Sequence, residues 1–133
     1  MKYVEAFNKL GYEVSAPRTD WTSEKDDGVC LTLWTREVEW TPQPPSLNLF
    51  EMSTPGSNAW EKLPGHAKRT MHLSRAMNEF GGRVDVVLVK GIPGEGIDSA
   101  DPWLTDQRNG FGWRLTKFDS ETGFFSVVAE KLN

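Results

Sequence analysis

The stretch that decides the fold is Gly28-Val29-Cys30-Leu31-Thr32-Leu33-Trp34. Its side chains fall into two alternating sets, which is the pattern of a β-strand whose two faces meet different surroundings. The alternation continues as far as Trp40. Because a strand from Gly28 to Trp40 would exceed the usual length, we expect a bend or a bulge near Thr35.

Two other segments carry the spacing of amphipathic helices. In residues 2–10, Tyr3, Phe7 and Leu10 stand at positions i, i+4 and i+7, so they share one helical face. Residues 65–80 form the longer predicted helix, which the pair Gly81-Gly82 ends. The buried face of this second helix is predicted to carry Leu73, Ala76, Met77 and Phe80.

Three further strands are predicted in the second half of the chain. Residues 84–90 are nearly all apolar, which is typical of a central strand buried on both faces. Residues 111–118 and 124–131 flank a turn over residues 119–123, so they predict a β-hairpin.

The remaining segments are predicted to be connections. Residues 21–27 are polar and read as a loop. Residues 41–65 and 91–110 are rich in proline and glycine, and connections of such length are commonly binding loops or lids. We therefore expect one domain over residues 1–133, of the α+β class, with a curved, barrel-like and mostly antiparallel sheet and two main helices.

The composition narrows the classes of function. The net charge is −4 and the isoelectric point is near 5.2, which argues against a protein that coats nucleic acid without specificity but permits a local anion site. The single cysteine, Cys30, forms no internal disulfide and fits a reducing compartment. The chain starts without the apolar core of a signal peptide and has no apolar run long enough to span a membrane. We therefore expect a cytoplasmic protein without membrane contact.

One face of the longer predicted helix is basic. Lys68, His72 and Arg75 stand at i, i+4 and i+7, and Arg69 lies beside them. Positive charge in the first half of a helix opposes the helix dipole, and an anionic ligand at the helix N-terminus would resolve that conflict. The alternative is an ordinary solvated face.

Tryptophan is unusually frequent, with six in the chain. Trp34 and Trp113 stand in predicted strands and are expected in the core. Trp21, Trp60 and Trp103 stand in predicted loops, where tryptophan either lines a pocket or pins a loop to the core. An aromatic pocket beside a basic helix face suits a flat, anionic ligand such as a nucleotide or an extruded base.

Patterns for catalysis or metal binding are weak. His66 and His72 lack the spacing of zinc ligands, and Cys30 lies in mid-strand like an inert core thiol. The glycines that follow residue 90 lack the lysine and the helix of a phosphate-binding loop. Glu37 and Glu39 share one strand face and read as a solvated pair. We expect no catalytic residue, no metal and no cofactor.

Four short motifs follow one another along the chain. They are Pro17-Arg18-x-x-Trp21, Leu31-x-Leu33-Trp34-x-x-Glu37, Lys68-Arg69-x-x-His72-Leu73 and Gly82-x-Val84-x-Val86-Val87. In this order they resemble small PUA-like modules of the EVE type and the compact domains found beside restriction-type nucleases.

The resemblance implies a small β-barrel-like fold whose pocket accepts a flipped, often modified, base between aromatic walls. It implies Trp21 and Trp34 as the walls and Asp20 as the partner of the base edge. It further implies that Arg18, Lys68, Arg69 and Arg75 hold phosphates, and that His72 bonds a base or a sugar. The acidic net charge departs from a duplex-binding pattern and leaves free nucleotides open.

The sequence thus favours a non-enzymatic module that binds a nucleotide or a modified base in nucleic acid. One alternative is an acidic protein-interaction or inhibitor module of viral or defence type, whose acidic surface meets a basic protein partner. Another is a small enzyme acting on a nucleotide, with His72 as general acid or base.

Overall fold

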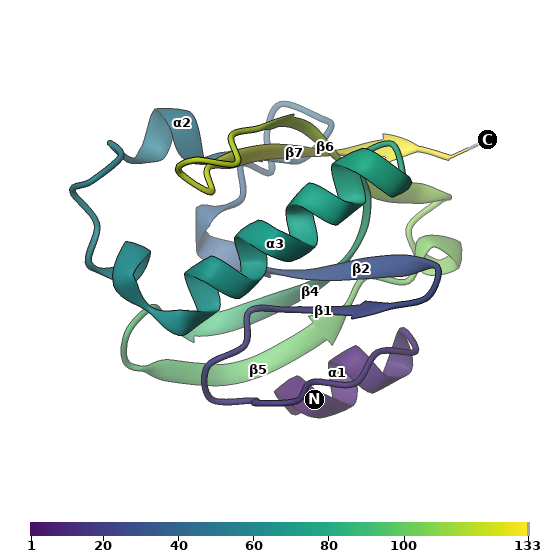
Figure 1. Ribbon diagram of the computed structural model, residues 1–133. Coiled ribbons are helices and arrows are strands. Elements are labelled where there is room, and N and C mark those ends of the chain that lie inside the picture. Colours follow the sequence, from purple (N-terminus) through teal and green to yellow (C-terminus); the bar gives the residue numbers. More distant parts are fainter. Residues whose placement is uncertain (133) are drawn as a thin grey trace.

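The computed structural model describes residues 1–132, which form an α+β fold built on one mixed sheet (Figure 1). The α-helices are α1 (Tyr3–Lys9), α2 (Leu49–Met52) and α3 (Pro64–Glu79). Short 3₁₀ helices are η1 (Thr35–Glu37), η2 (Ala59–Lys62) and η3 (Thr105–Gln107). The strands are β1 (Thr22–Lys25), β2 (Gly28–Trp34), β3 (Ser46–Asn48), β4 (Arg83–Ile92), β5 (Gly96–Pro102), β6 (Phe111–Phe118) and β7 (Phe125–Lys131).

Strand β4 is the centre of the sheet. The strand order is β1-β2-β4-β6-β7-β3, and β5 also pairs with β4. The pairing of β2 with β4 is parallel and the other strand pairs are antiparallel. The first residues of β4 pair with β6, and its second half pairs with β5. The sheet is not closed, although an isolated bridge between Glu39 and Ser46 connects the segment after β2 to β3.

Side chains on the two faces of β2 and β4 pack into two separate hydrophobic cores, because successive side chains of a strand point to opposite faces. Leu31 and Val86 are fully buried on the face that α3 covers, together with Leu73. Cys30 and Val87 are fully buried on the opposite face, against α1. In Figure 1, α3 crosses the sheet in front of β2 and β1, while α1 lies below, beside β5.

Helix α3 has clear signals at both ends. Pro64 stands at its first turn, where the missing N–H of proline costs nothing. At the other end Gly81 and Gly82 take positive φ angles of 60° and 86°, and the Gly82 N–H bonds back to the Ala76 carbonyl. A Cβ on Gly82 would lie 2.7 Å from the Leu115 carbonyl oxygen, so this reversal requires glycine.

Three elements predicted from the sequence patterns are confirmed, although Met77, expected on the buried face of the long helix, is exposed. The long helix, the central strand and the C-terminal hairpin become α3, β4 and β6–β7. The expected bend near Thr35 is the 3₁₀ helix η1, which ends β2.

All three predicted loops contain regular structure, since residues 41–65 hold β3, α2 and η2. Residues 21–27 contain β1, which forms a hairpin with β2, and residues 91–110 contain β5. Both strands lie beside one partner and lack the apolar alternation that marks a half-buried strand. In β1 the buried residues are the polar Thr22 and Ser23, and in β5 only Ala100 is buried.

Within residues 1–132, no helix is both long enough and apolar enough to cross a membrane.

Candidate functional site

A cavity of about 540 Å³ opens at one end of the sheet. Its wall combines the segment before β1, the end of β2, helix α2, the turn η2 and helix α3. The tip of the β4–β5 hairpin adds Gly94, Gly96 and Ile97, and β7 adds Phe125. In Figure 1 these elements gather on the left side, where α2, the start of α3 and the β4–β5 turn lie. Both long connections predicted from the sequence therefore contribute to one cavity.

Arg69 is the central charged residue of this wall. It stands in the second turn of α3, and its guanidinium carbon lies 4.9 Å from the ring centre of Trp21 and 5.3 Å from that of Trp60. The ring of Phe125 is 5.1 Å away. Three aromatic rings thus surround one cation, an arrangement that is favourable by cation–π attraction when water is excluded.

The guanidinium of Arg69 is short of hydrogen-bond acceptors. Its Nε and Nη2 atoms are buried and have no partner among the described residues. Burial lowers the pKa of Arg69 to about 10, against the opposing influence of Glu37, so the side chain stays charged at neutral pH. An unsatisfied buried donor costs about 1–3 kcal/mol, so an acceptor supplied from the cavity would be stabilising.

Glu37, in η1, is the second charged residue of the cavity without a direct partner. No hydrogen bond or ion pair within residues 1–132 involves its carboxylate. Burial raises the pKa of Glu37, and the charges of Arg69 and Arg36 only partly oppose that effect. Both Glu37 and Arg69 therefore line the cavity without a hydrogen-bond or ion-pair partner within residues 1–132.

Trp21, Trp34, Asp20 and Arg18 all line the cavity as well. Asp20 is buried, and its Oδ2 accepts from Lys68 Nζ at 2.8 Å and from the Ala16 N–H at 3.0 Å. Its negative charge is thus neutralised by the protein. Arg18 is exposed at the cavity, in a position to meet a group that projects into solvent.

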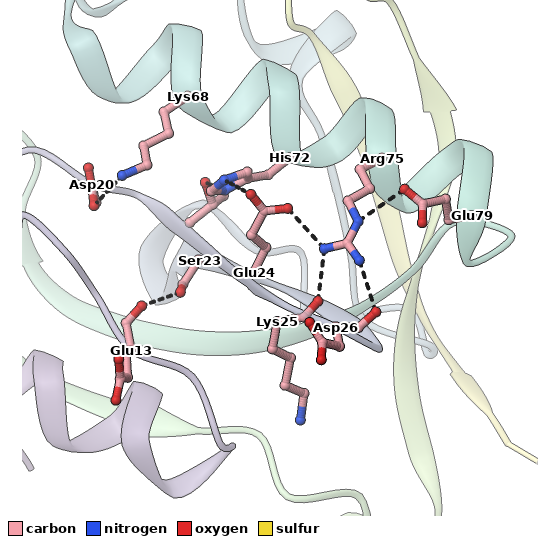
Figure 2. A network of polar contacts seen from close by, with 11 residues as sticks. Glu13, Asp20, Ser23, Glu24, Lys25, Asp26, Lys68, His72, Arg75 and Glu79 are labelled. Atoms are coloured by element: carbon pink, nitrogen blue, oxygen red, sulfur yellow. Dashed lines mark hydrogen bonds and ion pairs between the residues drawn. The ribbon is translucent and has the colours of Figure 1, made fainter.

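The basic face of α3 does not line the cavity. Figure 2 shows Lys68, His72 and Arg75 extending from α3 toward β1 and the segment before it, where they meet acidic side chains and carbonyls. Arg75 is within 2.9 Å of Glu24 and 3.0 Å of Glu79, and it donates to the Lys25 and Asp26 carbonyls. The positive charge that opposes the helix dipole is therefore neutralised inside the fold. Of the four basic-face residues, Arg69 alone is in the cavity wall.

His72 lies in a buried polar contact between α3 and β1. Its Nε2 is 3.2 Å from a Glu24 carboxylate oxygen and its Nδ1 is 2.7 Å from the Thr22 hydroxyl. Since a carboxylate only accepts, Nε2 carries the proton and Nδ1 accepts from Thr22. Both His72 and Thr22 are buried, at 3% and 1% exposure, and neither lines the cavity. The imidazole and the hydroxyl of this acid–histidine–hydroxyl array are therefore buried, whereas its acid, Glu24, is partly exposed.

The sequence left two cavity residues without a role in the site. Glu37 was predicted to be solvated because its strand face is acidic, but η1 turns it into the cavity wall. Trp60 was one of the loop tryptophans, and η2 fixes it there. The signal available was Asn58-x-x-Glu61, a capping pattern: the Glu61 carboxylate accepts from the Asn58 N–H at 2.9 Å and from the Gly56 N–H at 3.0 Å.

The described residues contain no group of three or more His, Cys, Asp or Glu side chains placed to hold a metal ion. A comparison with protein-family models finds no match for this chain, and neither do searches of curated proteins and of solved structures.

Proposed function

We propose that this cavity binds a nucleobase, of a free nucleotide or of an unpaired position in a nucleic acid, as a recognition module without catalysis. The observation that supports this most is Arg69, an unsatisfied guanidinium held among aromatic rings in the cavity wall. A nucleobase would supply a partner for each kind of group in this wall. Its π-face can stack on the aromatic rings, and the acceptors on its edge can bind the guanidinium.

The size and lining of the cavity support the same proposal. A volume of about 540 Å³ lies in the range of about 300–1,000 Å³ for small-molecule sites. Trp21, Trp34 and Trp60 supply stacking surfaces, and each stacked base gains about 1–3 kcal/mol in proteins that bind single strands.

Arg18 provides a rationale for a nucleotide rather than a nucleobase alone. It is exposed at the cavity and makes no hydrogen bond or ion pair within the described residues. A phosphate that projects from the cavity would meet it. The basic residues Lys68 and Arg75, by contrast, are neutralised by Asp20 and Glu24, so we do not assign them to phosphate.

As part of this proposal, the sheet curves like a barrel around the cavity. The bridge between Glu39 and Ser46 brings β3 next to the continuation of β2, which would complete a ring through β4, β6 and β7. Such a ring would leave one mouth at the end of β2, where the cavity lies.

The proposal is tested by tryptophan fluorescence during titration with nucleosides, 5′-monophosphates and short single-stranded oligonucleotides. We expect saturable quenching by at least one of them and loss of binding in Trp60→Ala. Trp40→Ala is the matched control, because Trp40 is half-buried like Trp60 but lies outside this cavity. No response across the panel, or equal affinity in Trp60→Ala and wild type, would refute the proposal and favour a protein partner.

A further inference from the structure

Two opposite charges without partners face the same cavity. Glu37 and Arg69 both line it, and they interact through space without forming an ion pair within 4.0 Å. Asp20, the other carboxylate in the wall, is already paired with Lys68 at 2.8 Å. Besides the exposed Arg18, the wall thus contains one acceptor group and one donor group without partners.

Glu37 and Arg69 require opposite hydrogen-bonding groups on the edges of a bound base. An ionised carboxylate only accepts hydrogen bonds, and a guanidinium only donates them. A base that fits must therefore present N–H groups toward Glu37 and lone pairs toward Arg69. A carbonyl or ring nitrogen facing Glu37, or an amino group facing Arg69, would be repelled.

Guanine satisfies both requirements with two atoms each. Its N1–H and N2 amino group are adjacent donors that match the two oxygens of a carboxylate, and its O6 and N7 are adjacent acceptors that match a guanidinium. Adenine and cytosine carry one amino group beside a ring acceptor. Uracil carries one N–H between two carbonyls, which a carboxylate would repel.

We propose that the base recognised in the cavity is guanine, with Glu37 bonding N1–H and the N2 amino group and Arg69 bonding O6 and N7. This inference rests on the function proposed above, since it specifies the base for that same cavity. Trp21 and Trp60 contact the guanidinium and line the same cavity, so they are the rings proposed to stack on the base.

The first part of the test compares nucleosides that differ by single atoms. Affinities are measured by isothermal titration calorimetry for guanosine, inosine, 7-deazaguanosine, adenosine, cytidine and uridine. Guanosine is expected to bind most tightly. Inosine lacks the N2 amino group and 7-deazaguanosine lacks the N7 acceptor, so each is expected to bind roughly tenfold more weakly, the effect of one lost hydrogen bond to a charged group.

The second part assigns the two edges to their residues. Glu37→Gln is expected to weaken guanosine binding by roughly tenfold or more and to remove most of the preference over inosine, while the preference over 7-deazaguanosine remains. Glu39→Gln is the matched control, because Glu39 is an exposed glutamate two positions away that does not line this cavity. Thermal unfolding of both variants confirms that they fold.

The outcomes separate this inference from the function on which it rests. If another nucleoside binds as tightly as guanosine, or Glu37→Gln binds guanosine like the wild type, the guanine assignment is overturned and base binding stands. If no nucleoside, nucleotide or oligonucleotide binds, both fail.

Discussion

Arg69 and Arg75 stand on the same helix, but the fold uses them differently. Arg75 has an acceptor on every side, from Glu24, Glu79 and two backbone carbonyls. Arg69 has aromatic rings around it and two buried nitrogens without a partner. Arg75 joins β1 to α3, while Arg69 keeps two donors unsatisfied among its aromatic contacts, which is the expected pattern for a binding residue.

Replacement of Arg69 and of Arg75 should have opposite effects on stability and on ligand affinity. Arg69→Met removes a buried, unsatisfied charge, so the free energy of unfolding should stay within about 1 kcal/mol of wild type or rise, while ligand affinity is lost. Arg75→Met should lower the thermal midpoint and leave affinity unchanged, because its contacts join α3 to the β1–β2 hairpin. Thermal unfolding and the fluorescence titration measure both quantities. A large loss of stability in Arg69→Met would show that the guanidinium is a structural residue.

His72 gives a prediction about pH. Burial lowers the pKa of His72 below the ordinary value of 6.5, because desolvation and Lys68 outweigh Glu24 and Asp20. Below pH 6.5 the unfolded chain therefore takes up a proton more readily than the folded protein. The contribution of neutral His72 to the free energy of unfolding is fully present above pH 6.5. It is lost progressively as the pH falls from 6.5 through the pKa of His72 in the folded protein.

This pH dependence is measured by the thermal midpoint between pH 7.5 and pH 5, together with an NMR titration of the imidazole. His72→Gln should show a smaller loss of stability over the same range. A folded-state pKa of His72 above 6.5 would contradict the prediction, because it would mean that Glu24 dominates over burial.

At the scale of elements, the position of Trp21 depends on Gly65. A Cβ on Gly65 would lie 2.4 Å from the Thr19 carbonyl oxygen and 2.5 Å from Cε2 of Trp21. The first turn of α3 and the segment before β1 therefore approach so closely that only glycine fits. This contact places one aromatic ring over Arg69.

Gly65→Ala should accordingly disturb both stability and the cavity. We expect a loss of about 1–3 kcal/mol in the free energy of unfolding, typical of overpacking, together with weaker ligand binding as Trp21 moves. Ala67→Ser, at an exposed position two residues along the same helix, should change neither by more than about 0.5 kcal/mol. Unaltered affinity in Gly65→Ala would mean that Trp21 takes no part in the site.

The elements also show what the sequence could predict. Strand β4 was predictable because burial on both faces leaves a continuous apolar run, and helix α3 because burial of one stripe leaves a periodic pattern. Strands β1 and β5 were not, because β1 buries hydroxyl groups and β5 is mostly exposed. The spacing correctly predicted that basic residues share one face of α3. Spacing along the helix does not reveal that Glu24, from the β1–β2 hairpin, neutralises this face. Pairing between distant segments is a property of the tertiary fold, so Glu37 and Arg69 became neighbours only in the structure.

At the scale of the whole molecule, the cavity joins segments that are far apart in the chain. Met52 of α2 and Ile97 of β5 both line it, and both are exposed, at 45% and 41%. These two side chains, on the two rims of the cavity, keep much of their surface exposed in the free protein, whereas a bound base would contact both. The rims should therefore be the parts of the fold whose local stability depends most on the ligand.

Hydrogen exchange tests this coupling directly. Addition of ligand at about 100 times its Kd should stabilise the fold by about 2.7 kcal/mol, and it should slow amide exchange first in residues 49–63 and 92–97. Residues 105–110, around η3, border a different hollow and serve as the internal control, because they gain only the global stabilisation. Protection confined to one rim would mean that the ligand lies against one wall, and equal protection in all three segments would mean that the rims do not close over it. Protection of both rims above the control segment would show that two connections remote in sequence act as one binding surface.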